Sequence, residues 1–313
     1  MIKAILSNGS ILFEYFIDFI KSLKHSKSPI FISNSSREYE VILLAHTIEK
    51  GLSHPKIRYG FGLKNIRWML DVIEKINFDK KCYALSMAYG CLIDYIDLHE
   101  RVSYDLGEDA KRIEKFLKKC SDLGFERMGG VIDINKNYPA SKSLLLSRHS
   151  TRYFRDEIIS DENLSKIINI ARMAPSQCNR QSGVIFVCRN KEKIKKLLSL
   201  QGGAETFKDN VSNLFIIASD MRAWSGGGSR HQAHVDGALL GHQLALACCE
   251  HGVDSCFLNL AVTNKREDLI KNVAGISDNY RLVFMMAFGY SDRDAFKIPM
   301  SHRLSSESIS FEI

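Results

Sequence analysis

The stretch SRHSTRYF, residues 147–154, places cationic and hydroxyl side chains at alternating positions. In an extended segment, residues i, i+2 and i+4 point to one face, so Arg148, Ser150 and Arg152 would lie side by side. Two forked guanidinium donors and a hydroxyl on one face suit a phosphate group. The alternative is a solvated basic loop that merely begins a helix. The octapeptide by itself leaves both interpretations open.

A second polar cluster, APSQCNRQS at residues 174–182, follows an amphipathic stretch and precedes an apolar run. Its proline fixes a turn, and four hydrogen-bonding side chains lie within the next positions. Amides both donate and accept, which suits the edge of a heteroaromatic ring that carries carbonyls and ring nitrogens. The alternative is a polar connection between a helix and a strand. The four side chains are those of Ser176, Gln177, Asn179 and Gln181.

The composition is that of a soluble globular protein, with 45% hydrophobic and 25% charged residues among 313. The net charge of +7 is spread over both halves, which argues against nucleic-acid binding. The eight cysteines form no CxxC pair and several lie in apolar runs, so we expect free thiols and a cytoplasmic location. The apolar stretch 11–24 carries charges at helical spacing, so we expect a packed or interface helix and no membrane span.

Two regions with different patterns divide the chain. Residues 1–140 are predicted to be mainly helical, and residues 141–313 to form a second domain. The boundary is placed within 123–143 because Gly129, Gly130 and Pro139 interrupt the pattern there. In the first region, Gly51 stands where a helix would need a C-cap. The predicted helices of this region are 11–24, 37–51, 65–76, 80–100 and 109–120.

The second region alternates short apolar runs with helical stretches. The runs are rich in Val, Ile and Phe, which predicts buried strands and a small sheet wrapped by helices. Ser160 is a suitable N-cap for the first helix of this region. The predicted strands are 183–188, 213–219, 254–259 and 282–290, and the predicted helices are 160–174, 191–200, 234–252 and 265–275.

The order RHSTRYF, amphipathic helix, APSQCNRQ and strand resembles the nitroreductase family of FMN-dependent oxidoreductases. Three further features keep that family's order: the long helix DGALLGHQLALACCEHG (236–252) with the strand VDSCFL after it, a last strand ending in FGY (288–290), and the tail IPMSHRL (298–304). The resemblance covers about residues 144–313. It implies an α+β, nitroreductase-like fold with a small, mostly antiparallel sheet wrapped by helices. It also implies a homodimer with two flavin sites at the interface.

The resemblance assigns residues to the FMN site. Arg148, Ser150 and Arg152 would hold the phosphate and ribityl chain, with His149 beside them, and Arg303 would return to the phosphate from the tail. The segment from Cys256, through Leu258 and Asn259, would pass the pyrimidine or N5 edge of the flavin. The ring would also be contacted, in this family usually from the partner subunit, by Pro175, Ser176, Gln177, Cys178, Asn179 and Gln181.

Two positions depart from the family's pattern. Ser301 stands two positions before the tail arginine, where family members often carry a basic residue. The amide and lysine that often touch the flavin are not evident before the second strand, where Gln201 is a weak candidate. The finer cofactor contacts and the class of substrate are therefore left open.

The resemblance implies that FMN accepts a hydride from NADH or NADPH and then reduces a small-molecule substrate. The flavin carries this chemistry, so no side chain is named as catalytic. Two alternatives remain. The same fold could act as a dehydrogenase or flavin-consuming enzyme with oxygen as the acceptor, or as a non-catalytic flavin-binding protein whose N-terminal half recruits a partner.

Two further segments could contact a substrate. Trp224, in the glycine-rich stretch 222–234, could stack on it, although an ordinary connection with a partly buried tryptophan fits equally well. His54 and Arg58, in the stretch 46–62, could form an anion- or substrate-recognition loop, or belong to a cap and turn with solvated charges. No metal is expected, because His231 and His234 lack a cysteine or carboxylate at ligand spacing.

Overall fold

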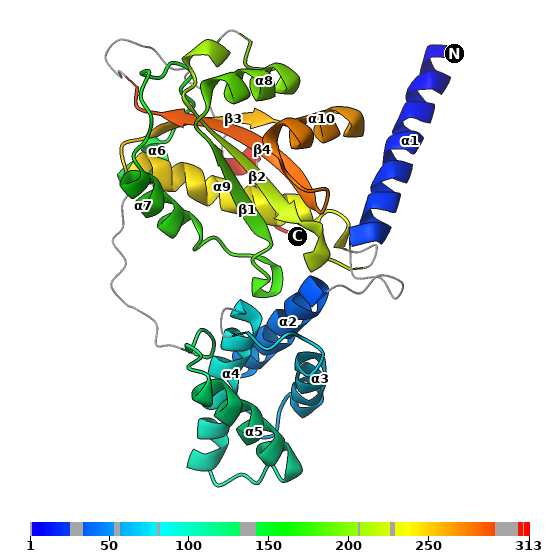
Figure 1. The fold of residues 1–313 in the computed structure, drawn as a ribbon, viewed down its shortest axis with the longest axis vertical. Coiled ribbons are helices and arrows are strands. Elements are labelled where there is room, and N and C mark those ends of the chain that lie inside the picture. The colour runs from blue at the N-terminus through cyan, green and yellow to red at the C-terminus, as the bar shows by residue number, and fades with distance from the viewer. Residues whose placement is uncertain are drawn as a thin grey trace.

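The computed structural model describes residues 2–25, 34–52, 57–79, 82–131, 142–205, 207–225, 229–291, 306–308 and 310–313. A sheet flanked by helices lies at one end of the molecule, and a bundle of helices lies at the other (Figure 1). The fold is α+β, as the sequence predicts.

Four strands form one antiparallel sheet in the order β1-β2-β4-β3. Each strand coincides with an apolar run predicted to be a strand, so the positions of the strands are confirmed. The prediction that every strand is buried is wrong for β1, whose side chains are half-buried or exposed because it lies at the edge of the sheet. β2 is buried along its whole length because it lies inside the sheet and both faces are covered. β1 and β3 are the two edge strands of this sheet. The strands are β1 (Gly183–Cys188), β2 (Asn213–Asp220), β3 (Asp254–Asn259) and β4 (Tyr280–Gly289).

Helices cover both faces of the sheet and bury its apolar side chains in two clusters. On one face, the rings of Phe215 and Phe288 stack with their centroids 3.7 Å apart beneath the helices. Alternate side chains of the same strands pack on the other face, as the period-two geometry of a strand requires. The first face carries α7 (Asp161–Ala171) and α9 (Gln232–Glu250), and the second carries α8 (Lys191–Gln201) and α10 (Asn264–Ala274).

The start of α7 shows how the sequence fixes one of these helices. The Ser160 hydroxyl accepts a hydrogen bond from the backbone N–H of Asn163 at 3.2 Å, which confirms the predicted N-cap. A short helix that the pattern did not indicate, α6 (Lys142–Ser147), precedes the extended segment that leads into α7.

α9 lies close against β4 because two glycines face the strand. A Cβ on Gly241 would lie 1.8 Å from the Cζ atom of Phe284, and a Cβ on Gly237 would lie 2.5 Å from the Cγ2 atom of Val283. Neither position has room for a methyl group. The two glycines therefore set the distance between the helix and the sheet.

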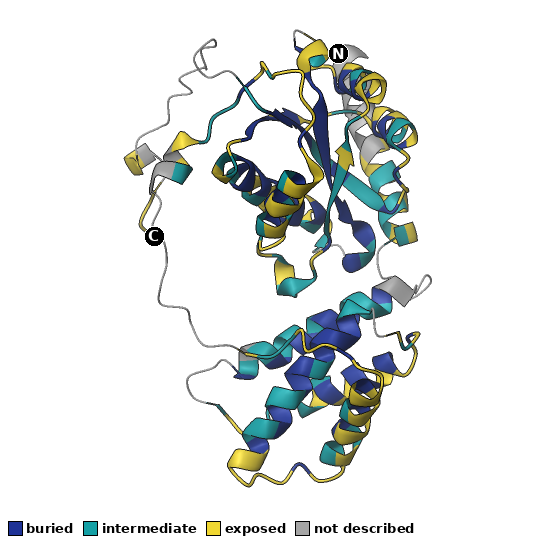
Figure 2. Ribbon diagram, turned by 60° about the vertical axis from the view of Figure 1, so that its left-hand side comes forward, coloured by how far each residue is buried: buried dark blue, intermediate teal, exposed yellow. Residues whose placement is uncertain are grey.

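The helices between residues 34 and 122 form a bundle around a core of their own. Buried apolar side chains from residues 41–125 form one cluster, separate from the two clusters around the sheet. Figure 2 shows these buried regions as two blocks with exposed residues around each. The helices of the bundle are α2 (Asn34–Leu52), α3 (Leu63–Ile73), α4 (Tyr83–Arg101) and α5 (Glu108–Asp122).

Gly51 does not cap a helix, and that prediction is wrong. α2 continues through it to Leu52, and Gly51 is glycine for another reason. A Cβ at this position would lie 2.0 Å from the Cε2 atom of Phe61, so the missing side chain makes room for that ring.

α1 (Ile2–His25) lies beside α10 and the sheet rather than within the bundle (Figure 1). Charged side chains join it to the sheet's helices and strands: Lys21 pairs with Asp268 at 3.0 Å, and Asp18 pairs with Arg281 at 2.8 Å. Its aromatic side chains at positions 13, 15, 16 and 19 are exposed. Among the described residues, no helix is long and apolar enough to cross a membrane.

We expect Gly241→Ala to lower the free energy of unfolding by about 1–3 kcal/mol, because the added methyl group overlaps the Phe284 ring. This loss would exceed the gain of up to about 1 kcal/mol that alanine brings to a helix interior. Urea unfolding followed by circular dichroism measures it. His242→Ala, an exposed change at the next position, serves as the control and should shift stability by less than about 0.5 kcal/mol. A Gly241→Ala variant as stable as the wild type would contradict the proposed close approach.

Candidate functional site

The segment that contains Arg148, Ser150 and Arg152 is held against the edge strand β3. Ser150 forms a parallel bridge with Ser255, and the Thr151 N–H donates a hydrogen bond to the Ser255 carbonyl at 3.0 Å. The segment is therefore extended next to β3, as the alternation of its side chains predicts.

His149 and Ser150 face different neighbours. The His149 ring lies with Nδ1 2.7 Å from the Ser147 carbonyl oxygen and Nε2 3.8 Å from the Asp254 carboxylate. Ser150 lies instead beside the Cys256 thiol, together with Arg152. Burial raises the pKa of that thiol, while the charge of Arg152 and the hydrogen bond from Ser150 lower it.

Both guanidiniums of the segment are available to a ligand. Arg148 is half-buried and Arg152 is exposed, and neither pairs with a carboxylate among the described residues. Close by, Thr151 is 5% exposed and its Oγ1 atom has no hydrogen-bond partner among the described residues. Thr151 alternates with Ser150 and Arg152, so its side chain belongs to the opposite face of the segment. The two guanidiniums, at alternating positions of one extended segment, are what an anion requires.

The end of β3 carries the next two predicted residues. Leu258 is buried in the core between the sheet and α8 and α10, so its side chain is a packing residue. Asn259 is exposed, and its carbonyl accepts a hydrogen bond from the Gln201 amide at 2.9 Å. Gln201 itself is 8% exposed and also binds the Gly203 N–H, so it fastens the end of α8 to the end of β3.

The cluster at 175–181 forms a tight, strained loop before β1. Cys178, Asn179 and Gln181 each have φ of +52°, which non-glycine residues rarely adopt. Conformations of this kind cost about 1–3 kcal/mol each and persist only where neighbouring contacts impose them. Two of the residues belong to the 3₁₀ helix η1 (Gln177–Asn179).

Hydrogen bonds from within and outside the loop impose this conformation. The Ser176 hydroxyl accepts from the Gln181 N–H at 3.0 Å, which closes the turn. The Gln177 N–H lies 3.2 Å from the carboxylate of Asp236, a buried residue of α9. Burial raises the pKa of Asp236, while hydrogen bonds from Gln232 and the Gln177 N–H lower it in part. No residue pattern near Gln177 indicates this role for Asp236, which lies 59 positions further along the chain.

Arg180 and the bundle hold the other side of the loop. The Arg180 guanidinium lies 5.0 Å from the centroid of the Trp224 ring and donates to the Gln177 side chain at 3.1 Å. Burial lowers the pKa of Arg180. From α4, the Tyr83 hydroxyl accepts a hydrogen bond from the Gln181 amide. The predicted ring-contacting loop is thus fastened to both the sheet and the bundle.

Trp224 follows the 3₁₀ helix η3 (Met221–Ala223) and is only 4% exposed. Its indole N–H donates to Ser219 Oγ at 3.4 Å, and its ring packs with Ala223, Ala233 and Tyr39 of α2. To stack on a substrate, the ring would have to leave its place beneath Arg180. Arg58 is exposed near the turn that leads into α3, whereas His54 and Arg303 lie outside the described residues.

The two halves of the predicted site lie at opposite corners of the sheet. The segment at 148–152 adjoins β3, while the loop at 175–181 leads into β1 on the opposite edge. With strands ~4.8 Å apart and a rise of ~3.4 Å per residue, Ser255 and Gly183 lie roughly 14 Å apart across the sheet and roughly 20 Å along it. Within one chain, the two groups therefore lie far apart.

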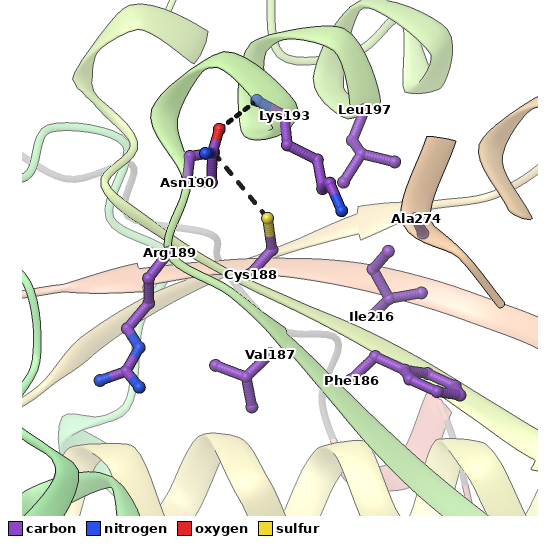
Figure 3. A pocket seen from close by; sticks show the side chains of 9 residues that line it. All are labelled: Phe186, Val187, Cys188, Arg189, Asn190, Lys193, Leu197, Ile216 and Ala274. Atoms are coloured by element: carbon purple, nitrogen blue, oxygen red, sulfur yellow. Dashed lines mark hydrogen bonds between the residues drawn. The ribbon is translucent and has the colours of Figure 1, made fainter. Parts of the chain in front are cut away.

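Two cavities adjoin β1. One, of about 340 Å³, lies between the loop, α7 and α9, where Pro175, Ser176 and Asp236 form part of its lining. The other, of about 210 Å³, lies on the α8 face of the strand and contains Cys188 and Lys193 (Figure 3). Arg189 and Val187 extend toward the other side of the strand in that view. No residue of the predicted site lines the second cavity.

No group of three or more His, Cys, Asp or Glu side chains in the described part of the chain is arranged to hold a metal ion. All eight cysteines are free thiols.

Comparison with known proteins identifies the region that contains both halves of the site. The model of the nitroreductase family matches residues 145–215 and 199–290. The chain carries a nitroreductase-family domain. It is therefore an oxidoreductase enzyme, and the match spans both the segment along β3 and the loop before β1.

The nitroreductase domain is similar to an archaeal protein and to solved structures of bacterial proteins. A protein of Archaeoglobus fulgidus named as an NADH dehydrogenase/NAD(P)H nitroreductase is 27% identical over 150 residues, which cover 47% of this chain and 83% of that protein. An FMN-dependent nitroreductase from Clostridium difficile R20291 is 22% identical, with a TM-score of 0.46, over 54% of this chain and 98% of its own. A nitroreductase family protein from Streptococcus pneumoniae TIGR4 is 20% identical, with a TM-score of 0.47, over 55% of this chain and 98% of its own.

The raised pKa of Asp236 makes the stability of the nitroreductase domain depend on pH. Its folded pKa lies above the ordinary value of 3.8, so the stability it contributes is present below that value and is lost as pH rises through the raised pKa. The asparagine of Asp236→Asn cannot titrate. As pH rises through the raised pKa, we therefore expect the free energy of unfolding of this variant to increase relative to that of the wild type. Urea unfolding at a series of pH values measures the difference.

Asp156→Asn is the control of opposite sign. Hydrogen bonds from Lys191 and Ser212 lower the pKa of Asp156, so the stability it contributes is present above 3.8 and lost as pH falls. As pH rises through this range, the free energy of unfolding of Asp156→Asn should fall relative to that of the wild type. Parallel pH curves for Asp236→Asn and the wild type would show that the Asp236 carboxyl titrates normally.

Proposed function

We propose that this protein is an FMN-dependent oxidoreductase that uses NADH or NADPH to reduce a small-molecule substrate. The family match and the name of the Archaeoglobus fulgidus relative support this class of reaction. The single observation that carries the cofactor assignment is the pair of guanidiniums, Arg148 and Arg152, on either side of Ser150 along β3, with no carboxylate partner in the described part of the chain.

The donors along β3 fit the phosphate end of FMN. Arg148, Ser150 and Arg152 would bind the phosphate, and Arg303 would join them from the tail. A dianionic phosphate accepts several charge-assisted hydrogen bonds at once, which a pair of forked guanidiniums supplies. Among the described residues, neither guanidinium has a competing ion pair that would have to break when an anion binds.

Bound FMN would supply the hydride chemistry, by accepting a hydride from the nicotinamide and passing it to the substrate. The chain would bind and orient the ring. β3 is an edge strand, so the outer backbone groups beyond Ser255 are free of sheet pairing and face the place where the ring edge would lie. Backbone N–H groups there would stabilise negative charge on the reduced ring. No side chain is required to take up a proton in this proposal.

We propose that the site is shared between two subunits of a homodimer. One chain supplies the phosphate-binding segment at 148–152, and its partner supplies the loop at 175–181. The opposite-corner placement of these groups supports the proposal, because a flavin held by one group in a chain cannot reach the other in the same chain. The free cysteines fit a reducing, cytoplasmic setting. Residues 1–140 would form a mainly helical region joined to the nitroreductase domain, with α1 lying against that domain and α2 to α5 forming the bundle.

The phosphate site can be tested by removing both guanidiniums. We expect Arg148→Ala/Arg152→Ala to weaken FMN binding at least about 100-fold, since each charge-assisted contact contributes about 1.5–3 kcal/mol. Fluorescence titration of the flavin-free protein with FMN measures this. Arg155→Ala, which removes an exposed guanidinium three positions after Arg152 and outside the alternating set, is the control. Full FMN binding by the double variant would contradict the assignment.

A hybrid dimer tests whether the site is shared. We would co-express Arg148→Ala/Arg152→Ala with Asn179→Gly/Gln181→Gly under different tags, glycine being compatible with the positive φ at both positions. A shared site predicts one FMN per hybrid dimer, because one of its two sites combines two intact halves. A site built within each chain predicts no FMN, because both chains then carry a defect. Each variant alone should bind none.

A further inference from the structure

We propose that Tyr83, from the helical region, is a positioning residue of the flavin site: it orients the Gln181 amide so that the amide oxygen is presented to a ring N–H. The proposal rests on the FMN assignment made above. It gives the helical region, which lies outside the residues that the family model matches, a part in the cofactor site.

The contact comes from two distant parts of the chain. Tyr83 is the first residue of α4, and its hydroxyl accepts a hydrogen bond from the Gln181 amide Nε2, 98 positions away. Tyr83 is half-buried, and Gln181 is exposed at the end of the loop. The hydroxyl therefore reaches the loop from the side of the bundle, whereas Asp236 holds the loop from the side of the sheet.

The hydrogen bonds settle which way the Gln181 amide points. Nε2 lies 3.4 Å from the Asn179 carbonyl oxygen, which can only accept, so the group on that side must be the NH₂. The same NH₂ donates to Tyr83. The amide oxygen is then left facing away from both partners. An acceptor in that place suits the imide N–H of a flavin ring, which is a donor between two carbonyls.

Tyr83 restrains the Gln181 side chain, which the backbone hydrogen bond of that residue does not. The Gln181 N–H binds Ser176, which fixes the backbone but leaves the side chain free to rotate. The bond to Asn179 is long, so the Tyr83 hydroxyl is the closer of the two side-chain anchors. Without the Tyr83 hydroxyl, the exposed Gln181 amide would sample several rotamers. Each time a flavin ring bound, the side chain would lose this freedom, which costs binding free energy.

The test is a double-mutant cycle of Tyr83→Phe, Gln181→Asn and their combination, each compared with the wild type. Asparagine tolerates the positive φ at position 181 but is too short to reach the hydroxyl. Tyr89→Phe is the matched control, a half-buried tyrosine in the same helix with no hydrogen bond to the loop. Far-ultraviolet circular dichroism shows that each variant is folded.

Three readouts are used. Hydrogen exchange of residues 176–182 is measured on flavin-free protein, and the FMN Kd and the visible circular dichroism of the bound flavin are measured on titration. We expect Tyr83→Phe to speed exchange in the loop, to weaken FMN binding about 5-fold and to change the flavin's dichroism. In the Gln181→Asn background, the same change should have no further effect on the Kd.

The outcomes separate this inference from the proposed function. If no protein in the set, including the wild type, binds FMN, the proposed function fails, and the flavin role of Tyr83 fails with it. If the wild type binds FMN and Tyr83→Phe matches Tyr89→Phe in Kd and exchange, the inference alone is wrong. If Tyr83→Phe weakens binding equally in both backgrounds, Tyr83 does not act through Gln181 and the inference is also wrong.

Discussion

The close contact between α9 and β4 is the constraint on which both parts of the candidate site depend. Gly237 and Gly241 let the helix approach Val283 and Phe284 more closely than any other residue would allow. Asp236 stands next to the first of these glycines, so the same approach brings its carboxylate to the Gln177 N–H. β4 in turn pairs with β3, whose outer edge carries the segment at 148–152, the proposed phosphate-binding segment. A shift of the helix would therefore disturb the loop directly, and would disturb the opposite edge through the strand.

The strand order explains why so small a sheet can serve two sites. An antiparallel sheet in the order β1-β2-β4-β3 has its first and third strands at its two edges. Edge strands offer unpaired backbone groups, which are a liability unless they are covered. Here, one edge is bridged by the segment around Ser150, and the other begins at the strained loop. The two edges of the sheet therefore carry different segments. In the proposed homodimer, the β3 edge of one chain would lie near the β1 edge of its partner.

Much of the fold could be predicted from the sequence, and the reason is local. Every strand coincides with an apolar run, because a sheet covered on both faces needs side chains that can be buried on both sides. The Ser160 cap is equally local, since its partner Asn163 is three positions away. Gly51 shows the limit of such reasoning. Its neighbour is Phe61, which comes close only after the chain has turned, so the glycine was wrongly interpreted as a helix end.

The sequence indicates which types of residue make up the candidate site, but not which distant residues hold them in place. The types of residue at 148–152 and 175–181 indicated an anion site and a polar loop, and both segments have the local form expected of them. The groups that hold the loop gave no signal, because Asp236 and Tyr83 reach it from 59 and 98 positions away. Trp224 likewise lies in a glycine-rich stretch, and only the three-dimensional arrangement puts Arg180 over its ring. Positive φ at three non-glycine residues is also invisible in a sequence, since neighbouring contacts impose it.

The bundle contacts the nitroreductase domain at this loop and at the neighbouring 3₁₀ helix η3. The two regions keep separate main cores, and Tyr39 packs against both the bundle core and the small cluster around Trp224. Tyr39 of α2 donates to the Asp220 carboxylate at 3.3 Å, and that carboxylate also binds the Arg222 guanidinium. The same tyrosine packs against Trp224, which lies under Arg180 of the loop. Tyr83 of α4 therefore contacts the loop directly at Gln181, and Tyr39 of α2 supports it indirectly through Trp224 and Arg180. These contacts act on the segment in which three non-glycine residues have a positive φ. The helical region is thus placed to govern the geometry of the ring-contacting loop while leaving the sheet unchanged.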